Sequence, residues 1–257
     1  MKKFVADFET CTWLENETFV WAWATCEIGN EDNLQIGTSI NTFIDFCQNE
    51  YNPVIYFHNA KFDLEFVIWW CFNNGFSHVT DLKDAKDYTF TTLIGDMGQF
   101  YSMTIYFKKR GKYERKVTFY DSLKIIPFSV KDIAKAFNLP ISKLEIDYNK
   151  PRKRNHKLTI QEKDYITNDV KIVAQALNEL FKENLTKMTQ GANALYDYKQ
   201  IINKSKFRAF FPEIDKEVDE DLRKSYKGGF TYLNPLYKGK EVGCGVVLDV
   251  NSLYPSP

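Results

Sequence analysis

Val5-Ala6-Asp7-Phe8-Glu9-Thr10 reads as an apolar strand with two carboxylates near its end, and this stretch decides the fold. Asp7 and Glu9 are two residues apart, so on a strand both side chains point to the same face. Neighbouring acids repel each other, and burial strengthens the repulsion. A cation between them removes that conflict, and hard oxygen ligands suit Mg²⁺ or Mn²⁺. Alone, the pattern is more typical of a solvated strand edge. A metal site is indicated only if the chain supplies further carboxylates in suitable places.

The composition is that of an ordinary globular protein. The chain has 257 residues, enough for one large domain or for one domain plus part of another. Its formal net charge is zero, so any contact with nucleic acid must rest on local patches. Aromatic residues make up 16% of the chain, which fits either an aromatic core or rings that stack on bases.

Cysteine usage and hydropathy exclude several classes of protein. The five cysteines are scattered without a CxxC pair, so we expect reduced thiols and neither a zinc site nor a disulfide framework. No apolar run approaches the length of a membrane span, and no signal peptide is recognisable. We therefore expect no membrane partner.

A third carboxylate follows a second short apolar strand, Val54-Ile55-Tyr56-Phe57. Apolar residues recur at helical spacing from Leu64 onward, so Asp63 falls at the start of a helix that directly follows the strand. An Asp in this place is usually an N-cap. The alternative is a third acid at the C-terminal edge of a sheet.

A fourth carboxylate lies on a longer predicted helix. Thr159-Ile160-Gln161-Glu162 has the capping-box pattern, and an amphipathic apolar stripe follows it. Tyr165 and Asp169 are four residues apart, so they share one face of this helix. They are either a tyrosine at the rim beside a surface acid, or part of a site.

Two segments are rich in cations. Residues 108–112 read as a hairpin tip, for which a solvated turn is favoured over a phosphate contact. Residues 143–157 are polar and irregular, which is typical of a flexible solvated loop. Beside a nuclease site, such a loop is also able to hold phosphates.

The carboxylates together indicate one kind of chemistry. Asp7, Glu9, Asp63 and Asp169 all fall at strand or helix ends, and Tyr165 lies one turn before the last of them. Four acids and a positioned hydroxyl are what a two-metal phosphodiester hydrolase needs. No thiol, Ser–His pair or P-loop offers a competing chemistry.

Three motifs resemble the exonuclease motifs in the proofreading domains of family B DNA polymerases. They are Asp7-Phe8-Glu9-Thr10, Asn59-Ala60-Lys61-Phe62-Asp63 and Tyr165-Ile166-Thr167-Asn168-Asp169. The resemblance implies an α/β domain of the ribonuclease H-like type, with a mixed sheet flanked by helices. It also implies a 3′→5′ exonuclease of the DEDD type, with two Mg²⁺ or Mn²⁺ ions per site.

Further motifs resemble the protein-primed branch of this family, which occurs in phages with linear genomes. They are Ser122-Leu123, Lys143, Tyr226-Lys227-Gly228-Gly229 and Asp249-Val250-Asn251-Ser252-Leu253-Tyr254-Pro255. By this resemblance, residues 1–187 form the exonuclease domain. Residues 188–257 form a linker and the beginning of a polymerase palm, which is truncated.

The resemblance also implies roles for single residues of the exonuclease part. Asp7, Glu9, Asp63 and Asp169 would hold the metals, Tyr165 would orient the attacking water and Lys143 would assist catalysis. The residues that would hold the frayed 3′ end are Thr10, Tyr56, His58, Asn59, Phe62, Phe66, Ser122, Leu123 and Tyr148. For three positions a structural role stays open: His58 is as often a satisfied structural residue, Phe66 a core residue and Lys143 a loop lysine.

In the second part, Asp249 matches a metal-binding carboxylate of the palm and Tyr254 a residue that helps to select the incoming sugar. Tyr226, Gly228 and Gly229 match a linker that helps to hold template DNA. The second catalytic Asp and the basic fingers helix of the family have no match before Pro257. We therefore expect no primer extension by this chain alone.

The leading hypothesis is the proofreading exonuclease of a protein-primed DNA polymerase used in viral DNA replication. The expected partners are the 3′ end of single-stranded DNA, primer-template DNA and a terminal protein, in the cytoplasm of a bacterial host. One alternative is a module that binds single-stranded DNA or docks a terminal protein without cutting. Another is a different ribonuclease H-like nuclease, such as an RNase or a junction resolvase.

Overall fold

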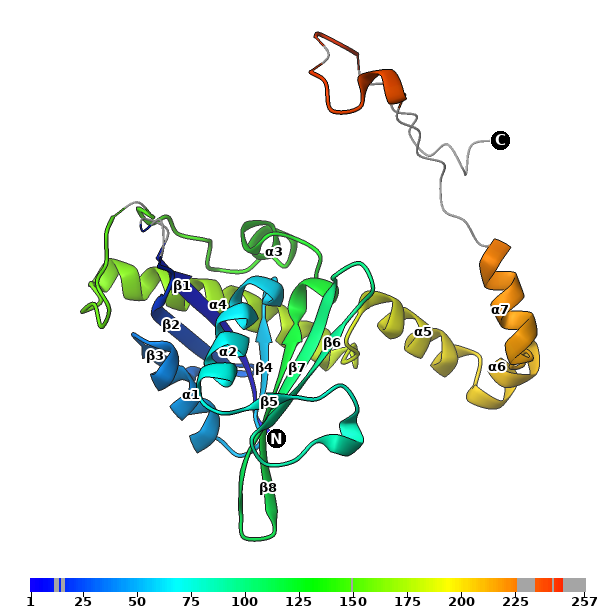
Figure 1. The fold of residues 1–257 in the computed structure, drawn as a ribbon, viewed down its shortest axis with the longest axis horizontal. Helices are drawn as coiled ribbons and strands as arrows, with labels where there is room; N and C mark the ends of the chain where they lie inside the picture. The colour runs from blue at the N-terminus through cyan, green and yellow to red at the C-terminus, as the bar shows by residue number, and fades with distance from the viewer. Residues whose placement is uncertain (12–13, 15–16, 149, 226–233, 242, 247–257) are drawn as a thin grey trace. The chain divides into compact units, whose positions relative to one another are not determined.

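A computed structural model describes residues 1–11, 14, 17–148, 150–225, 234–241 and 243–246. The chain forms two compact units, Met1–Ile201 and Ile202–Pro257 (Figure 1). The first unit contains the sheet and the candidate site. In the second, the described elements are α6 (Lys204–Phe210), α7 (Lys216–Ser225) and the short 3₁₀ helix η3 (Pro235–Tyr237).

The first unit is built on one eight-stranded mixed sheet with the strand order β3-β2-β1-β4-β8-β7-β6-β5. The strands are β1 (Lys3–Thr10), β2 (Val20–Glu27), β3 (Asn30–Gly37), β4 (Val54–Phe57), β5 (Ser77–His78), β6 (Thr89–Ile94), β7 (Phe100–Arg110) and β8 (Tyr113–Asp121). Strands β1, β4 and β8 run parallel to one another, while β2 pairs antiparallel with β1, and β7 with β8. The C-terminal ends of β1, β4 and β8 therefore meet at one edge.

Helices cover both faces of this sheet. They are α1 (Ile40–Asn49) and α2 (Ala60–Asn73) on one face, and α3 (Val130–Ala136) and α4 (Ile160–Lys182) on the other. The first unit also contains α5 (Gln190–Ile201) and the 3₁₀ helices η1 (Leu82–Asp84) and η2 (Ser122–Lys124). Figure 1 shows α2 in front of the sheet and α4 behind it. This arrangement confirms the predicted α/β fold, a mixed sheet flanked by helices.

The two faces of β1 belong to different cores. Phe4, Ala6 and Phe8 pack with apolar residues of α1 and α2. Val5 packs on the opposite side, with residues of α3 and α4. Because side chains alternate along a strand, Asp7 and Glu9 project to the face of Val5, toward α4. The predicted shared face of the two acids is thus confirmed.

The described helices include none that is both long enough and apolar enough to cross a membrane. The strand at Asn30–Gly37 lies outside the elements expected from the sequence.

Candidate active site

The turn between β4 and α2 is shaped by a buried acid at the end of the neighbouring strand. Asp121, the last residue of β8, accepts hydrogen bonds at Oδ1 from the backbone amides of Asn59 (3.1 Å) and Ala60 (3.3 Å). It also accepts one from the amide of Leu123 (3.0 Å). Asn59 has φ of 71°, the left-handed region that Asn tolerates better than most residues. The turn therefore starts α2 directly at the edge of the sheet.

This turn places Asp63 inside the first turn of α2. The helix begins at Ala60 after Asn59, so the expected N-cap role of Asp63 is wrong. Its side chain is buried instead of capping the helix end. Burial and repulsion from Asp7 raise the pKa of Asp63 well above its ordinary value.

Helix α4 brings the fourth acid and the tyrosine to the same place. The predicted capping box is present, with Thr159 and Glu162 each satisfying a backbone amide of the other. Tyr165 and Asp169 follow on one face, and both are buried. They are therefore neither a rim tyrosine nor a surface acid.

The four carboxylates interact electrostatically across three elements. Burial and repulsion from Asp169 raise the pKa of Asp7 to about 7. Burial and repulsion from Asp7 and Asp169 raise the pKa of Glu9 to about 9. Burial also raises the pKa of Asp169, although Lys143 opposes this change. We call Asp7, Glu9, Asp63 and Asp169 the carboxylate site.

The carboxylate site fits a cation by its donor chemistry. Asp169 Oδ1 is buried and has no hydrogen-bond partner, an arrangement that is costly unless a cation or water satisfies it. Hard carboxylate oxygens are the donors that Mg²⁺ and Mn²⁺ prefer. As they stand, no three His, Cys, Asp or Glu side chains of the described residues form a ready cation cage. Lys143 already engages the other oxygen of Asp169.

Two residues of the loop before α4 contact the site. Lys143 Nζ donates to Asp169 Oδ2 at 2.7 Å and lies 5.6 Å from the centroid of the Tyr165 ring. Burial disfavours its charge, but the hydrogen bond and attraction to Asp169 outweigh burial and raise the pKa of Lys143. Tyr148 forms a hydroxyl–hydroxyl hydrogen bond with Tyr165. Both loop residues were expected at the site.

The candidates for DNA contact fall into two groups. Exposed side chains that border the site belong to Asn59, Phe62 and Tyr148. The Phe62 ring lies 6.0 Å from that of Phe66, which packs partly against the core. Thr10 and Leu123 are partly buried.

The second group is engaged within the protein. His58 hydrogen-bonds through Nδ1 to Ser122 Oγ (3.0 Å) and through Nε2 to the carbonyl of Phe128 (2.7 Å). Ser122 is fully buried and donates to the carbonyl of Phe57. Tyr56 is buried between the rings of Tyr120 and Phe181. The polar or aromatic groups of these three residues are therefore engaged in contacts within the protein, and they support the edge of the sheet where the site lies.

Five candidate residues lie outside the described part of the chain. They are Tyr226, Gly228, Gly229, Asp249 and Tyr254.

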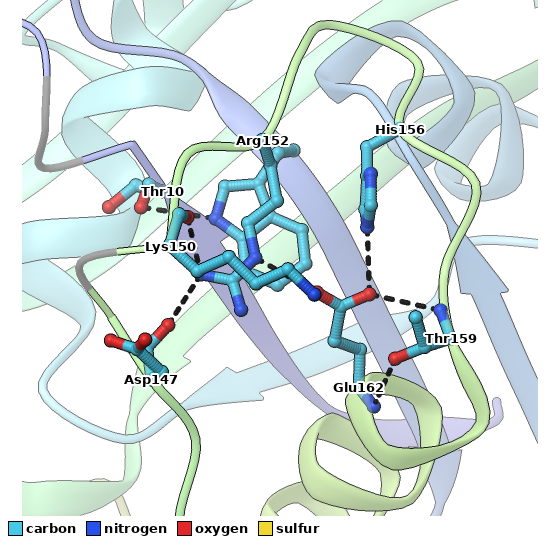
Figure 2. A network of polar contacts seen from close by, with 8 residues as sticks. Thr10, Asp147, Lys150, Arg152, His156, Thr159 and Glu162 are labelled. Atoms are coloured by element: carbon cyan, nitrogen blue, oxygen red, sulfur yellow. Dashed lines mark hydrogen bonds and ion pairs between the residues drawn. The ribbon is translucent and has the colours of Figure 1, made fainter.

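The sequence reasoning missed a buried polar network next to the site (Figure 2). Arg152 Nε donates to Glu162 Oε1 at 2.9 Å, and both side chains are buried. His156 Nε2 and the backbone amide of Thr159 contact Glu162 Oε2 at 2.7 and 2.9 Å. Arg152 lies in the charged stretch read as a solvated loop, so that interpretation is wrong for this residue. Of the residues in this network, only Thr159 and Glu162 were singled out by a sequence pattern, the capping box.

Comparison with known proteins agrees with this architecture. The family model "DNA polymerase type B, organellar and viral" matches residues 44–153 and 144–257. The DNA polymerase of Bacillus phage Nf is 45% identical over 255 residues, which are 99% of this chain and 44% of the relative. The chain thus spans less than half the length of that relative.

Solved structures give the same result. The structure "Phi29 DNA polymerase complexed with single-stranded DNA", whose protein is from Bacillus phage phi29, superposes with a TM-score of 0.82 at 38% identity. The match covers 93% of this chain and 42% of that one. The complex with primer-template DNA gives a TM-score of 0.81 over 94% and 42% of the two chains. The chain therefore belongs to the type B DNA polymerases of organelles and viruses, and resembles the phi29-like phage polymerases.

Proposed function

We propose that this chain carries a metal-dependent 3′→5′ exonuclease that hydrolyses single-stranded DNA from its 3′ end. The observation that carries the proposal is the carboxylate site, in which acids from β1, α2 and α4 raise one another's pKa values. Burying mutually repelling acids costs free energy, and a cation held between them offsets that cost. The acids also face a site where DNA, a polyanion, would otherwise be repelled.

Within this proposal, Asp7, Glu9, Asp63 and Asp169 hold two Mg²⁺ or Mn²⁺ ions. Such ions supply a hydroxide nucleophile near neutral pH and stabilise the leaving oxygen. Held by these acids beside the end of β1, the ions would offset the repulsion between the carboxylates and the scissile phosphate.

Tyr165 and Lys143 act beside the carboxylates. Burial and the hydrogen bond with Tyr148 raise the pKa of Tyr165, so its hydroxyl stays neutral and orients the attacking water. Lys143 keeps its positive charge, because its pKa is raised. That charge is available to a phosphate once Asp169 is otherwise engaged.

The 3′ end of the strand lies between exposed rings in this proposal. Phe62 and Tyr148 are half exposed and stack on unpaired bases, while Asn59 hydrogen-bonds to base or sugar. Thr10, Tyr56, His58, Phe66, Ser122 and Leu123 line or support the same groove. Unpaired ends are preferred, because stacked duplex ends do not enter between rings.

The whole relatives are named DNA polymerases, and we propose that this chain is the editing part of such a polymerase in viral DNA replication. Residues 1–187 form the exonuclease domain, and residues 188–257 the linker and the first part of the palm. Asp249 then belongs to a polymerase metal site, Tyr254 to its nucleotide site, and Tyr226, Gly228 and Gly229 to template contact. Primer-template DNA and a terminal protein are the further partners, in the cytoplasm of a bacterial host.

A labelled oligonucleotide tests the proposal. A 5′-labelled single strand is incubated with the protein and Mg²⁺, Mn²⁺ or chelator. We expect a ladder that shortens from the 3′ end and disappears with chelator or in Asp7→Ala/Glu9→Ala. The control Asp164→Ala removes an exposed acid of α4 and leaves the ladder intact. Binding without cleavage would overturn the proposal in favour of a binding module.

A further inference from the structure

The loop that precedes α4 pairs with the helix in antiparallel order. Ser142 accepts a hydrogen bond from Asn168, Lys143 contacts Asp169, Tyr148 contacts Tyr165 and Arg152 contacts Glu162. From Lys143 through Tyr148 to Arg152 the positions rise along the loop, while their partners fall along the helix from Asp169 through Tyr165 to Glu162. The loop therefore lies beside α4 in one register, and a slip of that register would misplace every pair.

Arg152 and Glu162 form the buried end of this series. Their side chains are 2% and 3% exposed, whereas Lys143 is 32% and Tyr148 50% exposed. Arg152 is also the one buried residue among those described from 138 to 159. A buried ion pair tolerates no displacement, because separating its charges leaves each without solvent or partner. The Arg152–Glu162 pair thus fixes the register at the buried end of the series. Lys143 and Tyr148, at the exposed end, depend on that register for their contacts with Asp169 and Tyr165.

The guanidinium of Arg152 also holds the loop backbone. One terminal nitrogen donates to the carbonyls of Asp147 (2.7 Å) and Lys150 (2.9 Å), which stand on either side of Tyr148 (Figure 2). A planar fork with several donors suits this task, and a lysine ammonium does not reproduce it. Arg152 therefore sets the backbone position from which Tyr148 reaches Tyr165.

The same side chain connects the loop to the end of β1. The Arg152 guanidinium lies 4.5 Å from the centroid of the Trp21 ring. Trp21 Nε1 in turn donates to the carbonyl of Thr10 at 3.2 Å. Thr10 follows Glu9 directly, so one guanidinium links the loop, α4 and the strand of the first two acids.

We infer that Arg152, clasped by Glu162, is a positioning residue for the exonuclease: it holds Lys143 and Tyr148 in register with Asp169 and Tyr165. The inference rests on the proposed function. Arg152 acts through the loop and does not touch the reacting atoms. Misplacement of a catalytic group by about 1 Å lowers rates by up to about a hundredfold.

Steady-state cleavage of a 5′-labelled single strand tests this role in wild type, Arg152→Gln and Arg152→Lys. We expect Arg152→Gln to lower kcat by roughly tenfold to hundredfold, and Arg152→Lys to give a smaller loss. The matched control is Arg154→Gln, which removes the same charge from the same loop but breaks an exposed pair with Glu17 and a cation–π contact with Phe19. Any loss in the control is confined to KM.

A coupling measurement separates positioning from mere loss of stability. If Arg152 acts through Tyr148, then Arg152→Gln in a Tyr148→Ala background should lower kcat far less than it does in wild type. An equal loss in both backgrounds would mean that the two residues act independently, and would overturn the inference.

The outcomes also distinguish the inference from the proposed function. Absence of cleavage by wild type would remove the proposed function itself. Cleavage by wild type with an unchanged kcat in Arg152→Gln would remove only the inference. If Arg152→Gln does not fold by circular dichroism, Arg152→Lys decides, because it keeps a charge opposite Glu162 but lacks the fork. A wild-type kcat in that variant would then overturn the inference.

Discussion

Glu162 and Asp169 lie about two turns apart on α4 and are both buried, yet their surroundings differ. Glu162 accepts hydrogen bonds from Arg152, His156 and the Thr159 amide. These contacts outweigh burial and lower its pKa to about 2. Asp169 accepts a hydrogen bond from Lys143 at Oδ2, whereas its Oδ1 has no hydrogen-bond partner. Burial raises its pKa.

The same contrast separates Asp121 from Asp63 at the start of α2. Asp121 accepts three backbone amides, whereas Asp63 faces Asp7 and Glu9. The acids enclosed by donors fix the turn and the loop, whereas the acids that repel one another form the carboxylate site. Burial alone therefore does not mark a functional acid. Repulsion from other acids beside it does.

The largest expected effect comes from making one acid of the carboxylate site neutral. Asp7→Asn should lower cleavage by roughly a hundredfold to a thousandfold, the size of losing one electrostatic contact to a reacting group. Without divalent ions it should raise the free energy of unfolding, because it removes repulsion between buried acids. Urea unfolding in chelator, beside the cleavage assay, measures both. If Asp7→Asn were less stable than wild type in chelator, Asp7 would not be an acid destabilised by its acidic neighbours, and its contrast with Glu162 would fail.

Removal of a satisfied acid should have the opposite signature. Glu162→Ala leaves Arg152 buried without its partner, so we expect a loss of about 3–5 kcal/mol in the free energy of unfolding. The apolar double variant Arg152→Met/Glu162→Leu should recover much of that loss, since no buried charge remains. Urea titrations at neutral pH compare the two variants. If the single and double variants were equally stable, the loss would come from the missing capping box of Glu162 and Thr159 and not from the unpaired charge of Arg152.

The sequence predicts the residues of the carboxylate site better than it predicts the buried contacts that hold the loop beside α4, and the reason is physical. Asp7 with Glu9 and Tyr165 with Asp169 are related by the local periods of strand and helix, so their shared faces follow from spacing alone. Arg152 is buried only because Glu162 and Trp21, distant in sequence, enclose it. A run of charges gives no sign of such a contact. Likewise, Asp63 misses the N-cap because Asp121, on another strand, sets where α2 begins.

The two kinds of acid should also respond oppositely to pH in metal-free protein. Glu162 has a folded pKa of about 2, below its ordinary 4.5, so its contribution is complete above pH 4.5 and disappears as pH falls toward 2. Asp7 has a folded pKa of about 7, above its ordinary 3.8. The folded state then binds more protons than the unfolded state between these values, so stability falls as pH rises from 3.8 to 7.

Variants assign the two limbs of this pH profile. In urea titrations with chelator, Asp7→Asn should flatten the fall above pH 4, and Glu162→Gln should flatten the fall below it. A profile in which Asp7→Asn changes only the acidic limb would show that the carboxylate is stabilised by donors, as Glu162 is.

The smallest expected effect concerns the turn before α2, which contacts Asp121 and leads to Asp63. Asn59 has φ of 71°, so Asn59→Ala should cost about 1 kcal/mol or slightly more, while Asn59→Gly should be close to neutral. Because its amide still donates to Asp121, neither change should release the turn. Asp63 then stays at the site, so kcat per folded molecule should be unchanged. Loss of the proposed contact between the Asn59 side chain and DNA should appear only as a higher KM. A lower kcat in Asn59→Gly would mean that the Asn side chain, and not the backbone of the turn, positions Asp63.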